Sequence, residues 1–175
     1  MKEDVILVDE QDTVTGTMEK MEAHLSGRLH RAISVFIFNT KGELLIQQRA
    51  LDKYHSGGKW SNTCCSHPRP GEDTTDAAHR RLFEEMGLEC KLRFGFSFIY
   101  YAEMATGLSE HEFDHVYLGI SDNEPVPDPE EVAAYKYISA DELETELRHY
   151  PEKYTEWLNI CLNKLLITYQ NMAFN

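Results

Sequence analysis

The architecture of this chain is constrained most by WSNTCCSHPRPGEDTTDAAHRRLFEEMGL, residues 60–88. It opens with a short segment that we expect to be extended, in which Cys65 and His67 are two residues apart. Because residues i and i+2 of an extended chain project to the same side, this thiol and imidazole should face one site. Cys64 should point the other way, and we interpret it as a small buried side chain.

A helix should follow within the same stretch. Residues 74–76 (TTD) offer N-cap oxygens, apolar residues recur every four positions, and Gly87 stands where a helix C-cap belongs. On this helix Arg81 and Glu85 are four residues apart. Such a pair is ordinarily a surface ion pair that contributes about 0.2–0.5 kcal/mol. The alternative is a site in which Glu85 holds a metal ion and Arg81 meets an anion.

The composition indicates a single globular domain. With 175 residues the chain can bury a full core, and we expect one domain over residues 1–175. The net charge is −13, from 17 basic and 30 acidic residues. Non-specific nucleic-acid binding needs a basic face, so we expect no nucleic-acid partner. An acidic chain that binds a polyanion must gather its few cations, together with metal ions, at one place.

The sequence also predicts where the protein works. The first ten residues, MKEDVILVDE, mix charge into a short apolar run, so we expect no signal peptide. No apolar run reaches the length of a membrane span, and we expect no membrane partner. Four cysteines in a chain without an export signal indicate reduced thiols and a cytoplasmic protein. We expect a monomer, or at most a weak dimer.

Residue patterns predict further strands and helices. A break at residues 16–17 (GT) should start a helix over residues 18–25, and residues 39–42 (NTKG) indicate a hairpin turn. Ser139 and Glu142 make a capping box for a short helix. The expected strands span residues 5–8, 33–38, 44–48, 91–101, 110–120 and 134–138, and the expected last helix spans residues 154–169.

Two carboxylates stand on one expected strand. Glu110 and Glu112 share a strand face, and paired carboxylates repel unless a cation or a proton lies between them. A solvated strand edge is the simpler interpretation. Apolar Val116 and Leu118 on the same face nevertheless indicate that this face turns inward.

Each of the other candidate residues has a plain structural explanation when taken alone. His24 and His30 make an H-x5-H pattern, which matches no fixed zinc spacing. Arg49 and Lys53 follow a strand into a loop, where cations are normally solvated. Trp157 lies on the apolar stripe of the last helix, which predicts core packing.

The spacing within residues 60–88 resembles the Nudix box, which opens with Gly and ends in R-E-U-x-E-E-x-G-U. In proteins that carry this box, the helix glutamates hold a divalent cation against a diphosphate. Ser66 replaces the opening glycine, and Arg81 replaces the glutamate after the box arginine. A hydrolase uses that carboxylate in its metal cluster, so an arginine there favours diphosphate binding over metal-assisted hydrolysis. The matching residues are Glu72, Arg80, Leu82, Glu84, Glu85, Gly87 and Leu88.

Taken together, these fragments resemble one family, the type I isopentenyl-diphosphate delta-isomerases, which have a Nudix fold. The resemblance covers nearly the whole chain, and its C-x-H-P and E-x-E motifs are not part of a general Nudix hydrolase. It implies an α/β (α+β) fold in which a mixed β-sheet is sandwiched between helices. The matching positions are Lys20, His24, His30, Arg49, Lys53, the block W-S-N-x-C-C-S-H-P from Trp60, Arg80, Arg81, Glu85, Gly87, Tyr100, E-H-E from Glu110, and Trp157.

The resemblance implies a metal centre with five protein ligands. Three imidazoles and two carboxylates would neutralise a divalent ion and leave one octahedral position unfilled. The family binds Mn2+, Mg2+ or Zn2+ in this centre. A second ion, Mg2+, would join the substrate diphosphate to Glu85 and to the backbone carbonyl of Cys65. The five implied ligands are His24, His30, His67, Glu110 and Glu112.

The resemblance also implies how a substrate is held and changed. Interconverting isopentenyl and dimethylallyl diphosphate requires one proton to be added and another removed, through an intermediate like a tertiary carbocation. The family assigns these transfers to Cys65 and Glu112, and Tyr100 aids them. Trp157 would lay its ring against the cation. The implied diphosphate-binding residues are Lys20, Arg49, Lys53 and Arg81.

Two other functions share parts of this pattern. A Nudix hydrolase of a diphosphate-containing substrate would share the fold and Mg2+, but Arg81 and the C-x-H and E-x-E motifs oppose it. A binding module with a structural metal would have no use for the unpaired thiol of Cys65 beside a metal ligand. We therefore predict a metal-dependent isomerase of isoprenoid biosynthesis whose partner is a small diphosphate substrate.

Overall fold

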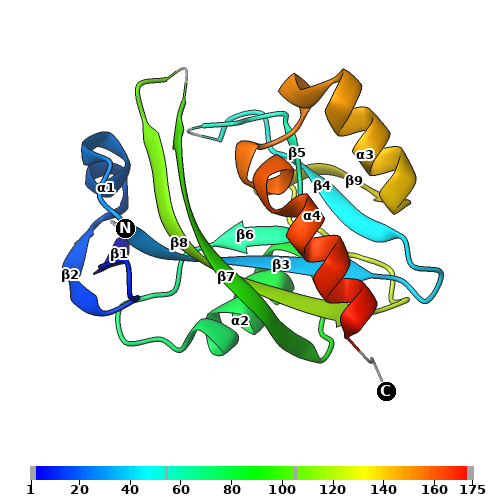
Figure 1. Ribbon diagram of the computed structural model, residues 1–175, viewed down its shortest axis with the longest axis horizontal. Helices are drawn as coiled ribbons and strands as arrows, with labels where there is room; N and C mark the ends of the chain where they lie inside the picture. Colours follow the sequence, from blue (N-terminus) through cyan, green and yellow to red (C-terminus); the bar gives the residue numbers. More distant parts are fainter. Residues whose placement is uncertain (1–2, 54, 105, 173–175) are drawn as a thin grey trace.

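The computed structural model describes residues 3–53, 55–104 and 106–172, and Figure 1 shows these residues arranged around one mixed β-sheet. The strands are β1 (Asp4–Val8), β2 (Val14–Glu19), β3 (His30–Phe38), β4 (Leu44–Arg49), β5 (Trp60–Ser61), β6 (Cys64–Ser66), β7 (Leu92–Glu103), β8 (Ser109–Ile120) and β9 (Val132–Ile138). The helices are α1 (Lys20–Ser26), α2 (Thr74–Met86), α3 (Ala140–His149) and α4 (Glu156–Asn171), with a short 3-10 helix, η1, over Pro151–Lys153.

Strand β3 is the centre of the sheet. It pairs in parallel with β8 along its whole length, from His30 opposite Glu112 to Phe38 opposite Ile120. Its other edge pairs antiparallel with β1, β6 and β4 in turn. Strand β7 extends the sheet beyond β8, and β9 extends it beyond β4. The first residue of β3 is therefore held beside β8 by a continuous ladder.

Alternate residues of β3 face two different helical layers. Ile33, Val35 and Ile37 pack with residues of α2 in one core cluster. Phe36 and Phe38 pack with residues of α3 and α4 in the other. Figure 1 accordingly shows α2 on one side of the sheet and α4 on the other. The predicted sandwich of a mixed sheet between helices is confirmed.

The face of β8 that α4 covers changes from apolar to polar along the strand. Val116 and Leu118 belong to the core beneath α4. Two, four and six residues before Val116, the same face carries Asp114, Glu112 and Glu110, each no more than 7% exposed. The strand face therefore turns inward, as expected. The buried carboxylates lie at the end of the sheet that α4 does not cover.

The start of α1 differs from the expectation. Residues 14–19 do not enter a helix but form β2, which pairs antiparallel with β1. Pairing satisfies the backbone groups of β1 that would otherwise lie at the edge of the sheet, so tertiary structure overrides the local helix pattern. The helix begins at Lys20, and the Glu19 carboxylate caps it by accepting from the Glu22 N–H at 3.1 Å.

The central helix, α2, keeps its predicted extent but uses a different N-cap. The cap is Asp73 rather than a residue of 74–76, and its carboxylate accepts from the Thr75 N–H at 2.8 Å. Gly87 is the C-cap with a left-handed φ of 62°, as expected. Helix α3 has the predicted capping box between Ser139 and Glu142.

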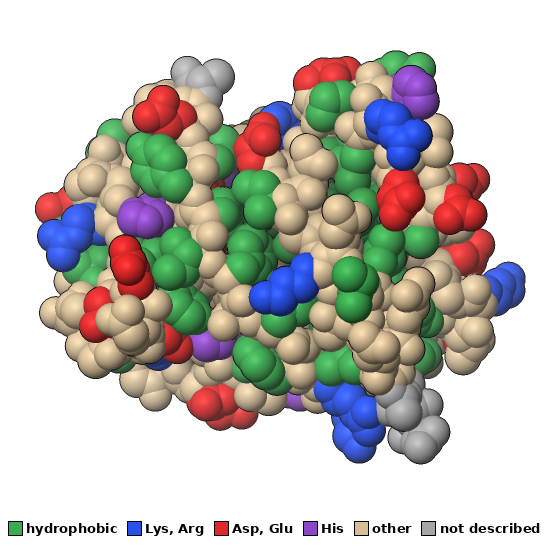
Figure 2. All heavy atoms as spheres, viewed as in Figure 1, with side chains coloured by type: hydrophobic (Ala, Val, Ile, Leu, Met, Phe, Trp, Pro, Cys, Tyr) green, Lys and Arg blue, Asp and Glu red, His purple; other side chains and the backbone are tan. Residues whose placement is uncertain are grey.

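The surface carries mixed charge. Figure 2 shows acidic, basic and apolar side chains interspersed on the face that carries β7 and α4, rather than a continuous basic field. The four cysteines, all within the described ranges, are free thiols. Within those ranges no helix combines the length and the low polarity that crossing a bilayer would require.

Candidate active site

A cavity of about 520 Å³ opens where the polar end of the sheet meets α1, α2 and α4. His24 and His30 are fully buried behind its wall, with ring centroids 5.6 and 5.0 Å from that of His67. Positions from Lys20 to Trp157 thus meet in one place. The predicted site residues that line the cavity are Lys20, Arg49, Lys53, Cys65, His67, Arg81, Glu85, Tyr100, Glu110, Glu112 and Trp157.

Backbone carbonyls fix the orientation of two histidines. His24 Nδ1 lies 2.7 Å from the carbonyl oxygen one helical turn earlier, and His30 Nδ1 lies 2.8 Å from the carbonyl oxygen two residues earlier. Because a carbonyl oxygen only accepts, Nδ1 carries the hydrogen and Nε2 presents a lone pair in each neutral ring. These Nε2 atoms lie 3.4 Å from Glu110 Oε1 and 3.5 Å from Glu112 Oε1. A lone pair facing a buried carboxylate is repulsive, so a cation or a proton must lie between them.

The donor set fits a divalent metal ion. Ligand atoms of His24, His30, His67 and Glu112 lie within 4.8 Å of one another, and Glu110 joins them through its contact with His24. Among the described residues, His30 Nε2 is buried without a hydrogen-bond partner, which suits a nitrogen that ligates a metal. Neutral imidazoles with two carboxylates carry two negative charges, which one divalent ion would balance.

The environment of Glu112 fixes three protonation states. Tyr100 Oη donates to Glu112 Oε2 at 2.6 Å, and His67 Nε2 lies 2.8 Å from Oε1. Burial acts to raise the pKa of Glu112, but its contacts with His30 and His67 outweigh burial and hold that pKa below its usual range. Burial raises the pKa of Tyr100 well above its usual range and lowers the pKa of His67 to about 3. At neutral pH the carboxylate is therefore ionised, the phenol protonated and the imidazole neutral.

Cys65 lies across β3 from Glu112. Strand β6 places Cys65 opposite Ser34 on the antiparallel edge of β3, whereas β8 carries Glu112 on the parallel edge. Burial raises the pKa of the Cys65 thiol to about 12, although the Arg49 guanidinium, with Nη1 3.6 Å from Sγ, acts in the opposite direction. The thiol is thus protonated at neutral pH. Cys64 is fully buried in the core cluster beneath α2, as expected.

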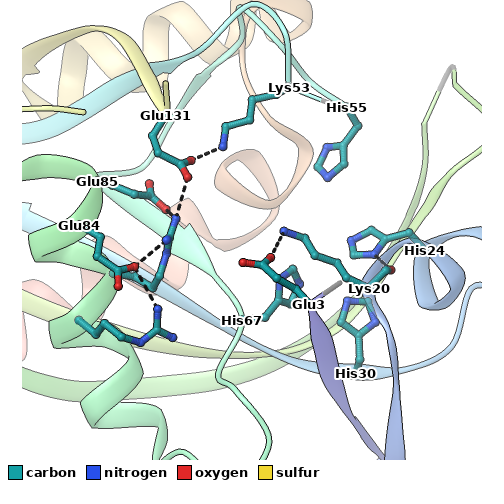
Figure 3. Close-up of polar contacts among 12 residues, drawn as sticks. Glu3, Lys20, His24, His30, Lys53, His55, His67, Glu84, Glu85 and Glu131 are labelled. Atoms are coloured by element: carbon teal, nitrogen blue, oxygen red, sulfur yellow. Dashed lines mark hydrogen bonds and ion pairs between the residues drawn. The ribbon is translucent and has the colours of Figure 1, made fainter. Parts of the chain in front are cut away.

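The other end of the cavity holds cations in ion pairs with carboxylates, as Figure 3 shows. The Arg81 guanidinium lies 2.7 Å from Glu84 and from Glu85, and 3.2 Å from Glu131. Lys53 also contacts Glu131. Burial lowers the pKa of Arg81, but Glu85 and the other negative groups around it, Glu131 among them, together more than offset burial and raise that pKa. Because Glu85 is only 4% exposed, its pair with Arg81 is not the ordinary surface ion pair.

Two further contacts complete the lining. Lys20 Nζ lies 3.2 Å from Glu3 Oε2, and Figure 3 shows this pair beside His67. Trp157 is 4% exposed and donates from Nε1 to Asn62 Oδ1 at 3.0 Å. The Arg49 guanidinium carbon lies 5.6 Å from the centroid of the Trp157 ring. Trp157 therefore packs in the core and also forms a wall of the cavity.

Several cavity residues were not predicted from the sequence, among them Glu3, His55 and Glu131. His55 Nε2 lies 2.5 Å from Glu110 Oε1, and both side chains are 3% exposed. In the sequence, His55 only follows Lys53 by two positions in a loop, which does not place its ring. Glu131 lies in a connection that the sequence marks only as acidic. These contacts depend on long-range folding, which local patterns do not encode.

Known proteins share the sequence of this chain over most of its length. Residues 28–158 match the NUDIX domain family. An isopentenyl-diphosphate Delta-isomerase of Pectobacterium atrosepticum is 54% identical over 162 residues, which cover 93% of this chain and 90% of that protein. An isopentenyl-diphosphate Delta-isomerase 2 of Aromatoleum aromaticum is 52% identical over 166 residues, which cover 95% of this chain and 88% of that protein.

Solved structures share the fold at much lower sequence identity. A Deinococcus radiodurans protein superposes with a TM-score of 0.78 at 21% identity, covering 93% of this chain and 98% of that one. A MutT protein from Methanosarcina mazei superposes with a TM-score of 0.67 at 16% identity, covering 82% of this chain and 96% of that one. At these identities the likeness shows the fold alone.

Proposed function

This chain belongs to the isopentenyl-diphosphate Delta-isomerase family of NUDIX-domain proteins, and from that premise we propose how its cavity interconverts isopentenyl and dimethylallyl diphosphate. The reaction adds a proton to the terminal carbon of the double bond and removes one from the carbon on the diphosphate side. The atoms balance without any other reactant. One observation carries the proposal: a thiol, Cys65, and a carboxylate, Glu112, line one cavity from opposite edges of β3.

We assign the two proton transfers to Cys65 and Glu112. The thiol is protonated and the carboxylate is ionised at neutral pH, so one group starts as a donor and the other as an acceptor. Their roles exchange when the reaction runs in reverse. The Tyr100 hydroxyl orients Glu112 through its hydrogen bond. The Trp157 ring would face the cationic intermediate, a contact that contributes about 2 kcal/mol when water is excluded.

The metal centre has a supporting role in this proposal. When bound, a divalent ion (Mn2+, Mg2+ or Zn2+) supplies the positive charge that balances the buried carboxylates. A Mg2+ ion that enters with the substrate diphosphate would take Glu85 and the backbone carbonyl of Cys65. The residues that would hold the first ion are His24, His30, His67, Glu110 and Glu112.

The substrate diphosphate belongs among the cations that line the cavity. Lys20, Arg49, Lys53 and Arg81 would surround it, which gives an acidic chain one cationic place for a polyanion. We propose further that residues 1–175 act as one domain and that the enzyme works in the cytoplasm on this small substrate. Both statements are predictions from the sequence.

Proton NMR of isopentenyl diphosphate with purified protein and Mg2+ in D2O tests the function. We expect dimethylallyl diphosphate to form, with deuterium entering the allylic positions, because the added proton comes from exchangeable groups. Release of inorganic phosphate or of a monophosphate would instead establish a hydrolase. An unchanged spectrum with metal bound would indicate a binding module.

The role of the thiol is tested by a pair of adjacent cysteines. Cys65→Ala should abolish turnover and leave the far-ultraviolet circular dichroism spectrum unchanged, because it removes one of the two proton-transfer groups. Cys64→Ala is the matched control, since Cys64 lies in the core cluster beneath α2 and not in the cavity. Near-normal turnover by Cys65→Ala would remove the thiol from the mechanism.

A further inference from the structure

A fourth histidine, His55, stands beside the three that are expected to ligate the metal. Its Nε2 lies 2.5 Å from Glu110 Oε1, and its ring centroid lies 5.8 Å from that of His24. Figure 3 shows the ring entering from the loop after Lys53, on the side of the histidine cluster opposite His30. His55 is only 4% exposed, so this is a buried contact and not a surface pair.

The distances around Glu110 match a shared metal ion. The ligand atoms of His24, His55 and Glu110 lie within 4.8 Å of one another, and this group shares His24 with the group of His24, His30, His67 and Glu112. In an octahedral site with bonds near ~2.1 Å, neighbouring ligand atoms are about 3 Å apart and opposite ones about 4.2 Å apart. The separations of Glu110 Oε1 from the two imidazole nitrogens, 2.5 Å to His55 and 3.4 Å to His24, lie on either side of the first value.

The loop that carries His55 is held by its own backbone. Gly58 N–H donates to the Arg49 carbonyl at 3.0 Å, and Arg49 Nη2 lies 3.4 Å from the His55 carbonyl oxygen. Gly57 passes so close to Leu51 that a Cβ at this position would lie 2.5 Å from the Leu51 carbonyl oxygen. These contacts position His55 before a ligand binds, as a coordination site requires.

We propose that His55 is a further protein ligand of the metal centre, beside the three histidines and two glutamates. The inference rests on the metal site of the proposed function and deepens it. A further imidazole at this place would exclude water from the ion. Such an ion holds Glu110 and Glu112 in place, which suits proton transfer on a water-sensitive cation and not hydrolysis.

Proton NMR of the Co2+-loaded protein tests the assignment. Each imidazole bound to this paramagnetic ion gives a strongly shifted N–H resonance that disappears in D2O. We expect four such resonances in the wild-type protein and one fewer in His55→Gln. His79→Gln is the matched control, because His79 is exposed on α2 and outside the cavity. Competition with a chelator should show Co2+ affinity about 10- to 100-fold weaker in His55→Gln alone.

The outcomes separate this inference from the proposed function. Three shifted resonances in the wild-type protein, with the same three in His55→Gln, would overturn it and leave His55 as a hydrogen-bond partner that orients Glu110. No shifted imidazole resonance in any protein would remove the histidine metal centre itself, and the inference with it. The isomerisation assay is read independently, so failure of the function is distinguishable from either result. The wild-type count decides the question even if His55→Gln does not fold.

Discussion

The two ends of the cavity differ in how their side chains are held. The histidine end consists of His24, His30, His55, His67, Glu110 and Glu112. The cation end consists of Lys53 and Arg81 with their carboxylate partners Glu85 and Glu131. Side chains of these histidines and glutamates are at most 12% exposed, whereas Lys53 and Arg81 at the other end are 21% and 17% exposed.

This difference in burial goes with a difference in charge. At the histidine end, imidazoles fixed by backbone carbonyls face two carboxylates, so the end lacks a positive charge. At the cation end Lys53 and Arg81 already have carboxylate partners, so their charges are balanced without a ligand. The first end is therefore built to receive a cation, and the second must exchange partners to receive an anion.

The largest effect is expected from Glu112→Gln at the histidine end. The amide keeps the shape of the side chain but removes a metal ligand and a proton acceptor. General acid–base groups contribute about 100- to 10,000-fold to rate, so we expect kcat to fall by about 1,000-fold or more. KM should change little, because the diphosphate is bound at the other end. A purely raised KM, measured by initial rates on isopentenyl diphosphate, would contradict the division of roles.

The second effect concerns the pKa of the Cys65 thiol, which burial raises and the Arg49 guanidinium lowers. Burial raises the pKa of its thiol from 9.0 to about 12, so the reactive thiolate is scarce below that pH. We expect iodoacetamide to modify Cys65 at pH 8 about 1,000-fold more slowly in the folded protein than in urea. The rate should rise about tenfold per pH unit and continue to rise beyond pH 9.

Peptide mass spectrometry over a pH series measures this rate for Cys65 alone. Limited access without a raised pKa would give a slow rate that levels off near pH 9. Fast modification at pH 8 would mean that the effect of Arg49 on the thiol pKa outweighs the effect of burial. Positive charge in the cavity would then activate the thiol.

Metal removal should lower the thermal stability of the protein through the histidine end and not through the cation end. A ligand at 1,000 times its dissociation constant adds about 4 kcal/mol to the free energy of unfolding, which is about 10 °C in Tm for a chain of this length. We expect Mn2+ to raise the Tm of the chelator-treated protein by about this amount, and His24→Gln to lose most of the increase. His79→Gln should keep it. An equal increase in His24→Gln would place the ion away from the histidine end.

Sequence patterns anticipated the two ends unequally. Glu110 and Glu112 could be placed on an inward face from strand periodicity, because Val116 and Leu118 continue that face into the core. Two-residue spacing likewise placed Cys65 in the cavity and Cys64 in the core. What turned separate polar residues into one predicted site was the family resemblance, since periodicity does not say which strands are neighbours.

Contacts between loops were beyond the sequence. Nothing in the residue pattern brings His55 to Glu110, because the two are joined only through the packing of a loop over the sheet. Glu131 reaches Lys53 and Arg81 in the same way, from a segment with no regular structure. The predicted start of α1 was wrong for a related reason, because the pairing of β2 with β1 depends on the assembled sheet.

At the cation end, Arg81→Lys should weaken binding and spare chemistry. Lysine keeps the charge but lacks the planar fork that reaches several oxygens at once. We expect KM to rise about tenfold with kcat nearly unchanged, the pattern of an interaction made equally in the ground and transition states. Arg148→Lys is the control, because Arg148 is exposed on α3 and outside the cavity. A fall in kcat equal to the rise in KM would mean that Arg81 acts on the reacting carbons.

The smallest effect is expected from Glu131→Gln, and it should be a gain. Glu131 occupies Lys53 and Arg81, two of the cations assigned to the diphosphate. Ion pairs that solvent reaches contribute about 0.2–1 kcal/mol, so losing this competitor should tighten inorganic pyrophosphate binding by about two- to fivefold at low salt. Calorimetric titration measures the affinity, and Glu130→Gln, the exposed neighbour, is the control for net charge. Weaker binding in Glu131→Gln would show that this carboxylate positions the cations, and the cation end would then be preorganised like the histidine end.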